Sequence, residues 1–240
     1  MKNLNFPGLA LMIFLTTAVS STSAQKKLPK NEYGLTVVSK ISDCKCTQKS
    51  AGDERLLPLS SYIPGLITDF KYATTENFTK RRLYKNPAAY GRQLLAKNLE
   101  EVQKELKISG LGIKVWDAYR PYSVTKKMWE MVPDERYAAN PANGSGHNRG
   151  AAIDLTLVDL RTGQELPMPT AFDNFTEKAH QDYQDLPEEV KKNRALLRSI
   201  MEKHGFVALE TEWWHYSLPD ARRFDLLDIP FRVLARTIGK

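Results

Sequence analysis

Residues 145–154 read SGHNRGAAID and combine a glycine-flanked histidine with the beginning of a strand. The strand is predicted over residues 151–158, where apolar and polar residues alternate. The apolar side chains should face the core, so that Asp154 projects from the opposite face, where a carboxylate needs solvent, a cation or a hydrogen-bond donor. His147, in the preceding loop, and Asp154 could therefore bind one metal ion. The alternative is a surface histidine beside a hydrogen-bonded aspartate.

A second unusual stretch reads EWWHY at residues 212–216. Catalytic zinc commonly has three protein ligands and an open position for water, and His147, Asp154 and His215 form such a set. Glu212 is then the candidate general base, with its pKa tuned by apolar surroundings. In an ideal strand, residues three apart face opposite sides, so Glu212 must lie in a turn or bulge to share the site with His215. The alternative is an aromatic core strand that contains a hydrogen-bonded histidine.

A third stretch, residues 115–121, reads VWDAYRP and places Arg120 at the end of a predicted strand, just before a proline. Site residues are common at such positions. The Arg120 guanidinium could stabilise an oxyanion that forms on an attacked carbonyl. The alternative is a surface arginine that pairs with Asp117 or with a phosphate.

Hydrophobic spacing in the rest of the chain predicts three helices and four short strands. The helices are expected over residues 97–107, 122–131 and 187–204, and the strands over residues 113–118, 151–158, 206–209 and 213–217. Short strands and segregated helices favour an α+β fold over repeating β-α-β units. We expect a single domain with a central, mainly antiparallel sheet flanked by helices, and a zinc site in a cleft on that sheet.

The N-terminal residues 1–24 have the layout of a secretory signal peptide, with Lys2, an apolar run and small residues up to Ala24. The apolar run is too short to span a membrane comfortably, which disfavours an anchor. We therefore expect an exported protein without a membrane span, either periplasmic or secreted. Residues 25–55 are polar and are expected to form an exposed lead-in, and residues 56–240 the catalytic domain.

Composition indicates a globular protein rather than a nucleic-acid-binding one. The 240 residues carry a formal net charge of +7, but the basic residues are spread among acidic ones instead of forming a stripe. The two cysteines, Cys44 and Cys46, are too close in sequence for a good structural disulfide and too few for a zinc site, although they could oxidise in an exporting compartment. We assign them no catalytic role.

The three stretches together resemble the zinc D-alanyl-D-alanine dipeptidases, the kind associated with vancomycin resistance, within a wider group that includes zinc D,D-carboxypeptidases. The matching motifs are Ser145-x-His147-x-x-Gly150-x-Ala152-x-Asp154, Glu212-x-Trp214-His215 and Asp117-x-Tyr119-Arg120-Pro121. Matches at residues 71–78 and 168–173 extend the resemblance. It implies that His147, Asp154 and His215 hold one zinc ion, that Glu212 acts as general base and acid, and that Arg120 stabilises the transition state.

The resemblance also implies a pocket for a free dipeptide. Tyr72 and Asp173 match positions near the substrate amine, and Ser145 matches one near its carboxylate. A zwitterionic dipeptide needs these partners, an anion for its ammonium group and donors for its carboxylate. Gly146 departs from the family, where a second serine precedes the first metal ligand, and this leaves the fine substrate preference open.

Three other activities remain open from the sequence alone. A zinc D,D-carboxypeptidase would trim peptidoglycan stem peptides, and an L,D-peptidase or endopeptidase would use the same chemistry. A non-catalytic zinc module could bind wall fragments, but a structural site needs no general base such as Glu212. A closed pocket with an anion at its amine end favours the dipeptidase, whereas an open groove favours the others. The oligomeric state is not fixed by the sequence, and cobalt or another divalent ion could replace zinc in vitro.

Overall fold

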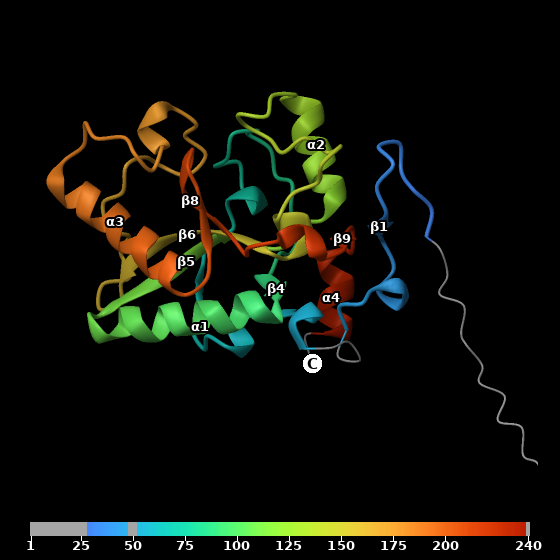
Figure 1. Ribbon diagram of the computed structural model, residues 1–240, viewed down its shortest axis with the longest axis horizontal. Coiled ribbons are helices and arrows are strands. Elements are labelled where there is room, and N and C mark those ends of the chain that lie inside the picture. Colours follow the sequence, from blue (N-terminus) through green and yellow to red (C-terminus); the bar gives the residue numbers. More distant parts are fainter. Residues whose placement is uncertain (1–27, 48–51, 239–240) are drawn as a thin grey trace, which may run out of the picture.

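The computed structural model of the protein describes residues 28–47 and 52–238. Its centre is a five-stranded sheet with the strand order β3-β5-β6-β8-β7 (Figure 1). The strands are β3 (Ile67–Thr68), β5 (Leu111–Asp117), β6 (Ala152–Asp159), β7 (Val207–Leu209) and β8 (Glu212–Ser217). Neighbouring strands are antiparallel except for the short β3, which pairs in parallel with β5. The expected α+β fold with a mainly antiparallel central sheet is confirmed.

Two long helices, α1 (Gln93–Ile108) and α3 (Glu188–Lys203), pack against the sheet and against each other. Figure 1 shows α1 running along the sheet beneath β5. Its buried apolar residues recur every three or four positions and form a single stripe. They are Leu95, Leu99, Val102 and Leu106. The predicted helix began at residue 97, but the structure adds a turn because Leu95 and Ala96 are buried in the core.

Helix α2 (Tyr122–Met131) has the bounds that the sequence predicts. It begins directly after Pro121, which has no N–H to leave unsatisfied at the helix start. The Asp228 carboxylate accepts a hydrogen bond from the Ser123 backbone N–H at 2.9 Å and so caps the first turn. Arg120 lies in the short segment between the end of β5 at Asp117 and the start of α2 at Tyr122. The cap on α2 helps to fix this segment.

A second apolar cluster joins the ends of the described chain. Its elements are β1 (Val37–Val38), which pairs in parallel with β9 (Leu226–Leu227), β2 (Leu56–Pro58), which pairs with β4 (Tyr90–Arg92), and α4 (Phe231–Thr237). Val38, Cys44 and Cys46 are buried in this cluster. The expectation of an exposed lead-in over residues 25–55 does not hold for them, because the apolar residues of β1 add to β9.

The two cysteines form a disulfide, the oxidised state that the sequence allows in an exporting compartment. The chain turns at Lys45 and brings the Cα atoms of Cys44 and Cys46 to 5.1 Å, which is within the usual range for disulfides. The Cys46 carbonyl accepts a hydrogen bond from Leu56 N–H at 2.8 Å. The disulfide therefore belongs to the packed part of the fold.

The expected signal peptide, residues 1–24, lies outside the described residues. Within residues 28–47 and 52–238, none of the helices has the length and apolar character that crossing a membrane requires.

Gly150 gives a test of how the fold positions His147. It ends the short 3-10 helix His147–Arg149 with φ +66°, and a Cβ added there would lie 2.5 Å from Leu56 Cδ1. We expect Gly150→Ala to lower the free energy of unfolding by about 1–2 kcal/mol through the left-handed backbone alone, and by more through the contact with Leu56.

Gly163→Ala is the matched control. Gly163 has a similar φ of +72°, but no atom lies within 4 Å of the position that an added Cβ would take, so the substitution costs only the backbone strain. Urea denaturation measures both losses. Equal losses in the two variants would contradict the role assigned to the Leu56 contact.

Candidate active site

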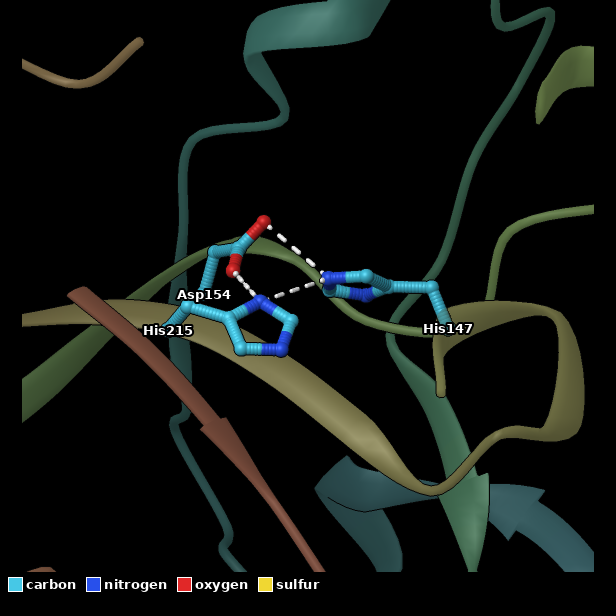
Figure 2. A group of neighbouring side chains, drawn as sticks. All are labelled: His147, Asp154 and His215. Carbon is cyan, nitrogen blue, oxygen red and sulfur yellow. Dashed lines mark hydrogen bonds and ion pairs between the residues drawn. The ribbon is translucent and has the colours of Figure 1, made fainter. Parts of the chain in front are cut away.

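Three side chains converge at the end of β6 and β8. His147 belongs to the short helix before β6, Asp154 lies in β6, and His215 lies directly opposite it in β8. Their nearest ligand atoms lie within 4.8 Å of one another, and Figure 2 shows them facing a common point. Asp154 Oδ2 is 3.3 Å from His147 Nε2, and Asp154 Oδ1 is 2.9 Å from His215 Nδ1. This donor set of two imidazoles and one carboxylate fits a single zinc ion.

The protein fixes the orientation of His147 through its second nitrogen. His147 Nδ1 lies 2.7 Å from the Ala118 carbonyl oxygen, which can only accept, so Nδ1 carries the proton and Nε2 offers its lone pair to the site. Such a hydrogen bond sets the tautomer and raises the basicity of a metal-binding histidine. The ring is buried, so its position does not depend on solvent.

The negative charge of Asp154 and the two imidazoles stabilise one another because they lie close together. Burial opposes ionisation of Asp154, but the charges and hydrogen bonds of His147 and His215 outweigh it and hold the pKa of Asp154 well below its usual range. Burial also disfavours the charged form of His215 and so lowers its pKa. The hydrogen bond and the charge of the Asp154 carboxylate outweigh this effect, and the pKa of His215 is raised overall. A cation can take the place of the proton that this arrangement favours.

Glu212 shares the pocket with His215 because the β7–β8 pairing is irregular. Ala208 lies opposite Tyr216, yet the next residue, Leu209, lies opposite Glu212, so three residues of β8 are bulged between these pairs. The expected bulge is therefore present, and Glu212 and His215 line the same cavity. Burial raises the pKa of Glu212, partly offset by His215. A raised pKa suits a general base.

Arg120 is buried rather than on the surface, with 7 % of its area exposed. Its Nε and Nη2 donate to Asp117 Oδ2 at 3.0 and 2.7 Å, and its guanidinium lies 5.0 Å from the centroid of the Tyr72 ring. Asp117 in turn accepts a hydrogen bond from the Tyr84 hydroxyl at 2.8 Å. The sequence did not single out Tyr84, which lies outside the motifs. Arg120 is thus held rigidly beside the metal ligands, with Nη2 4.0 Å from Asp154 Oδ2.

Asp173 and Tyr72 come together at another wall of the cavity. Asp173 accepts hydrogen bonds from the Tyr72 hydroxyl and from Phe78 N–H, both at 3.0 Å. Burial raises the pKa of Asp173 to about 7 despite these donors. Its backbone has φ 60°, a strained conformation for a non-glycine residue that concentrates at functional sites.

Ser145 and Gly146 also line the cavity. Ser145 Oγ accepts a hydrogen bond from Asn148 N–H at 3.2 Å, and its own N–H donates to Asn148 Oδ1 at 3.0 Å. A Cβ at Gly146 would lie 2.8 Å from Ala152 Cβ, so a side chain here requires a shift in the backbone. Gly146, which replaces the serine of the family, therefore packs closely against Ala152 of β6.

All eight residues that the sequence singles out line one cavity of about 210 Å³. They are Tyr72, Arg120, Ser145, His147, Asp154, Asp173, Glu212 and His215. Trp214 of the Glu212-x-Trp214-His215 motif also lines the cavity, as do four residues that the sequence did not single out, Glu135, Tyr137, Phe175 and Leu209. Glu135 and Tyr137 lie in an irregular loop without a recognisable motif, so no local signal could have found them.

Replacing one ligand tests whether the cluster binds metal. We expect Asp154→Asn to weaken zinc binding by about 10- to 100-fold or more, since changes to residues that merely support ligands already have that effect. Asp159→Asn, at the half-exposed far end of the same strand, is the control. Calorimetric titration with zinc measures both, and equal affinities would contradict the assignment.

Comparison with known proteins identifies the family of the chain. The family model described as D-ala-D-ala dipeptidase matches residues 53–232. A D-alanyl-D-alanine dipeptidase of Escherichia coli K12 is 38 % identical over 72 % of this chain and 89 % of its own length. One of Enterococcus faecium is 36 % identical over 68 % of this chain and 90 % of its own. The solved LdcB LD-carboxypeptidase is 16 % identical, with a TM-score of 0.40, over 87 % of this chain and 92 % of that one. The chain belongs to the D-alanyl-D-alanine dipeptidase family.

Proposed function

We propose that the protein hydrolyses the free dipeptide D-Ala-D-Ala to two D-alanines in peptidoglycan turnover, with one zinc ion held by His147, Asp154 and His215. One observation carries the proposal: a single small cavity combines this donor set and Glu212 with the half-buried carboxylate of Asp173. The names of the relatives support the same substrate.

Glu212 performs the proton transfers. When zinc is bound, it supplies Lewis acidity to the attacking water and to the scissile carbonyl. Glu212 accepts a proton from that water and returns it to the nitrogen of the departing D-alanine. Its burial makes the ionised carboxylate a stronger base than an exposed glutamate, and the bulge at the start of β8 aims it at the same space as His215.

Arg120 stabilises the negative charge that develops on the attacked carbonyl oxygen. Its two hydrogen bonds to Asp117 and the ring of Tyr72 hold the guanidinium in place before substrate arrives. A preorganised charge of this kind costs no rearrangement during the reaction and is worth more in a buried site than in water.

The two ends of the dipeptide are recognised by different residues that line the cavity. Asp173, oriented by Tyr72, pairs with the ammonium group, and Ser145 and the Gly146 backbone N–H donate to the carboxylate. Burial leaves Asp173 with a pKa near neutrality, so its negative charge is poorly stabilised until a cation arrives.

A zinc D,D-carboxypeptidase is the second candidate. Its stem-peptide substrate carries an amide where the dipeptide carries an ammonium group, so a buried carboxylate at that position gains less from binding it. The position of Asp173 on the wall of a small cavity therefore favours the free dipeptide. We further propose that residues 1–24 direct export, to a periplasm or to the medium, where wall fragments are found.

The role of Glu212 is tested with Glu212→Gln, which keeps the shape of the side chain but removes the base. We expect kcat to fall by about 10²- to 10⁴-fold while zinc remains bound. Glu210→Gln, an exposed neighbour that pairs with Arg198, is the control and should keep full activity. Turnover at the wild-type rate by zinc-loaded Glu212→Gln would exclude Glu212 as the base.

The raised pKa of Asp173 leads us to expect that kcat/KM depends on pH. Its ionised form binds the ammonium group, so kcat/KM should rise as pH increases through about 7, where Asp173 loses its proton. We expect Asp173→Asn to raise KM and to remove this limb of the profile. An unchanged KM with an unchanged profile would show that the amine binds elsewhere.

A further inference from the structure

Two cavities meet at the wall that contains Asp173. The cavity of the metal ligands and a neighbouring one of about 450 Å³ are both lined by Tyr137, Asp173 and Phe175. The neighbouring cavity contains none of the residues assigned to zinc or proton transfer. The three shared residues therefore separate the site of hydrolysis from a second space large enough for part of a peptide.

The aromatic part of this wall is an edge-to-face contact. The rings of Tyr137 and Phe175 lie 5.1 Å apart at 80°. Phe175 is fixed on its other sides by Phe78, at 5.7 Å, and by Trp214, at 6.1 Å. These contacts leave the Phe175 ring little freedom to move. The width of any passage between the two cavities therefore depends on the position of Tyr137.

Tyr137 is the more accessible half of the contact. It is 39 % exposed and lies in a turn after α2, where Tyr137 N–H donates to the Asp134 carbonyl. The Arg136 guanidinium lies 5.6 Å from the centroid of its ring. Replacement of this side chain should therefore leave the core intact and open the wall locally.

We propose that Tyr137 limits the substrate to two residues by closing the passage between the two cavities. This inference rests on the proposed function, because it takes Asp173 as the partner of the substrate amine. In a tripeptide, that nitrogen is an amide whose chain must continue past Asp173. Contact between Tyr137 and Phe175 blocks this direction, although the amide N–H could still donate to Asp173.

The test compares full-chain wild-type protein with Tyr137→Ala on D-Ala-D-Ala and on L-Lys-D-Ala-D-Ala, with release of the terminal D-alanine as the readout. We expect the ratio of kcat/KM for tripeptide to that for dipeptide to rise by about tenfold or more, the scale on which steric pockets discriminate. Dipeptide hydrolysis should persist with a raised KM, because Tyr137 is not placed at the reacting atoms.

Two variants control for other effects of the substitution. Tyr137→Phe keeps the ring and should keep the wild-type ratio. Tyr33→Ala removes a surface tyrosine of similar exposure, 41 %, that does not line the cavity. Thermal unfolding of each variant establishes that it is folded.

An unchanged ratio in Tyr137→Ala that still hydrolyses the dipeptide would overturn the inference, as would loss of both activities in the folded variant. These outcomes leave the proposed function standing. If wild-type protein instead prefers the tripeptide, the proposed dipeptidase function is wrong, and so is the proposed role of Tyr137.

Discussion

The pairing of β6 with β8 is the constraint on which the site depends. It places Asp154 directly opposite His215, while the loop that enters β6 supplies His147. Because side chains alternate across a strand, a slip of one residue in this register would turn one ligand away from the other two. The apolar residues of β6 are buried in the same core cluster as those of α1 and α3 and oppose such a slip. The hydrophobic core and the candidate metal centre are therefore set by the same register.

The cavity concentrates charge that an apolar interior does not tolerate without partners. Asp117 is paired with Arg120 and Tyr84, and Asp154 with two imidazoles, so these groups are satisfied within the protein. Asp173 has hydrogen-bond donors, but within residues 28–47 and 52–238 it forms no ion pair, and burial raises its pKa to about 7. Under the proposed function, Asp173 gains this missing partner from the ammonium group of the substrate.

Local sequence patterns predicted the parts of the site that lie within one element. Alternation in β6 and the aromatic run of β8 predicted the candidate ligands, the candidate base and the need for a bulge. The proline after Arg120 marked the start of helix α2, which was predicted with its observed bounds. Long-range packing was not predictable in this way. The addition of β1 to β9 and the placement of Tyr137 against Phe175 join segments that carry no mutual signal in the sequence.

The most direct measurement of the central claim is D-alanine release from free D-Ala-D-Ala and from a wall pentapeptide ending in D-Ala-D-Ala, with and without a chelator. The account predicts that the free dipeptide is cleaved, that the pentapeptide is spared, and that chelation abolishes cleavage until zinc is restored. Preference for the pentapeptide would contradict the dipeptidase assignment while keeping the zinc site. Cleavage that survives complete removal of the metal would contradict the account at its centre.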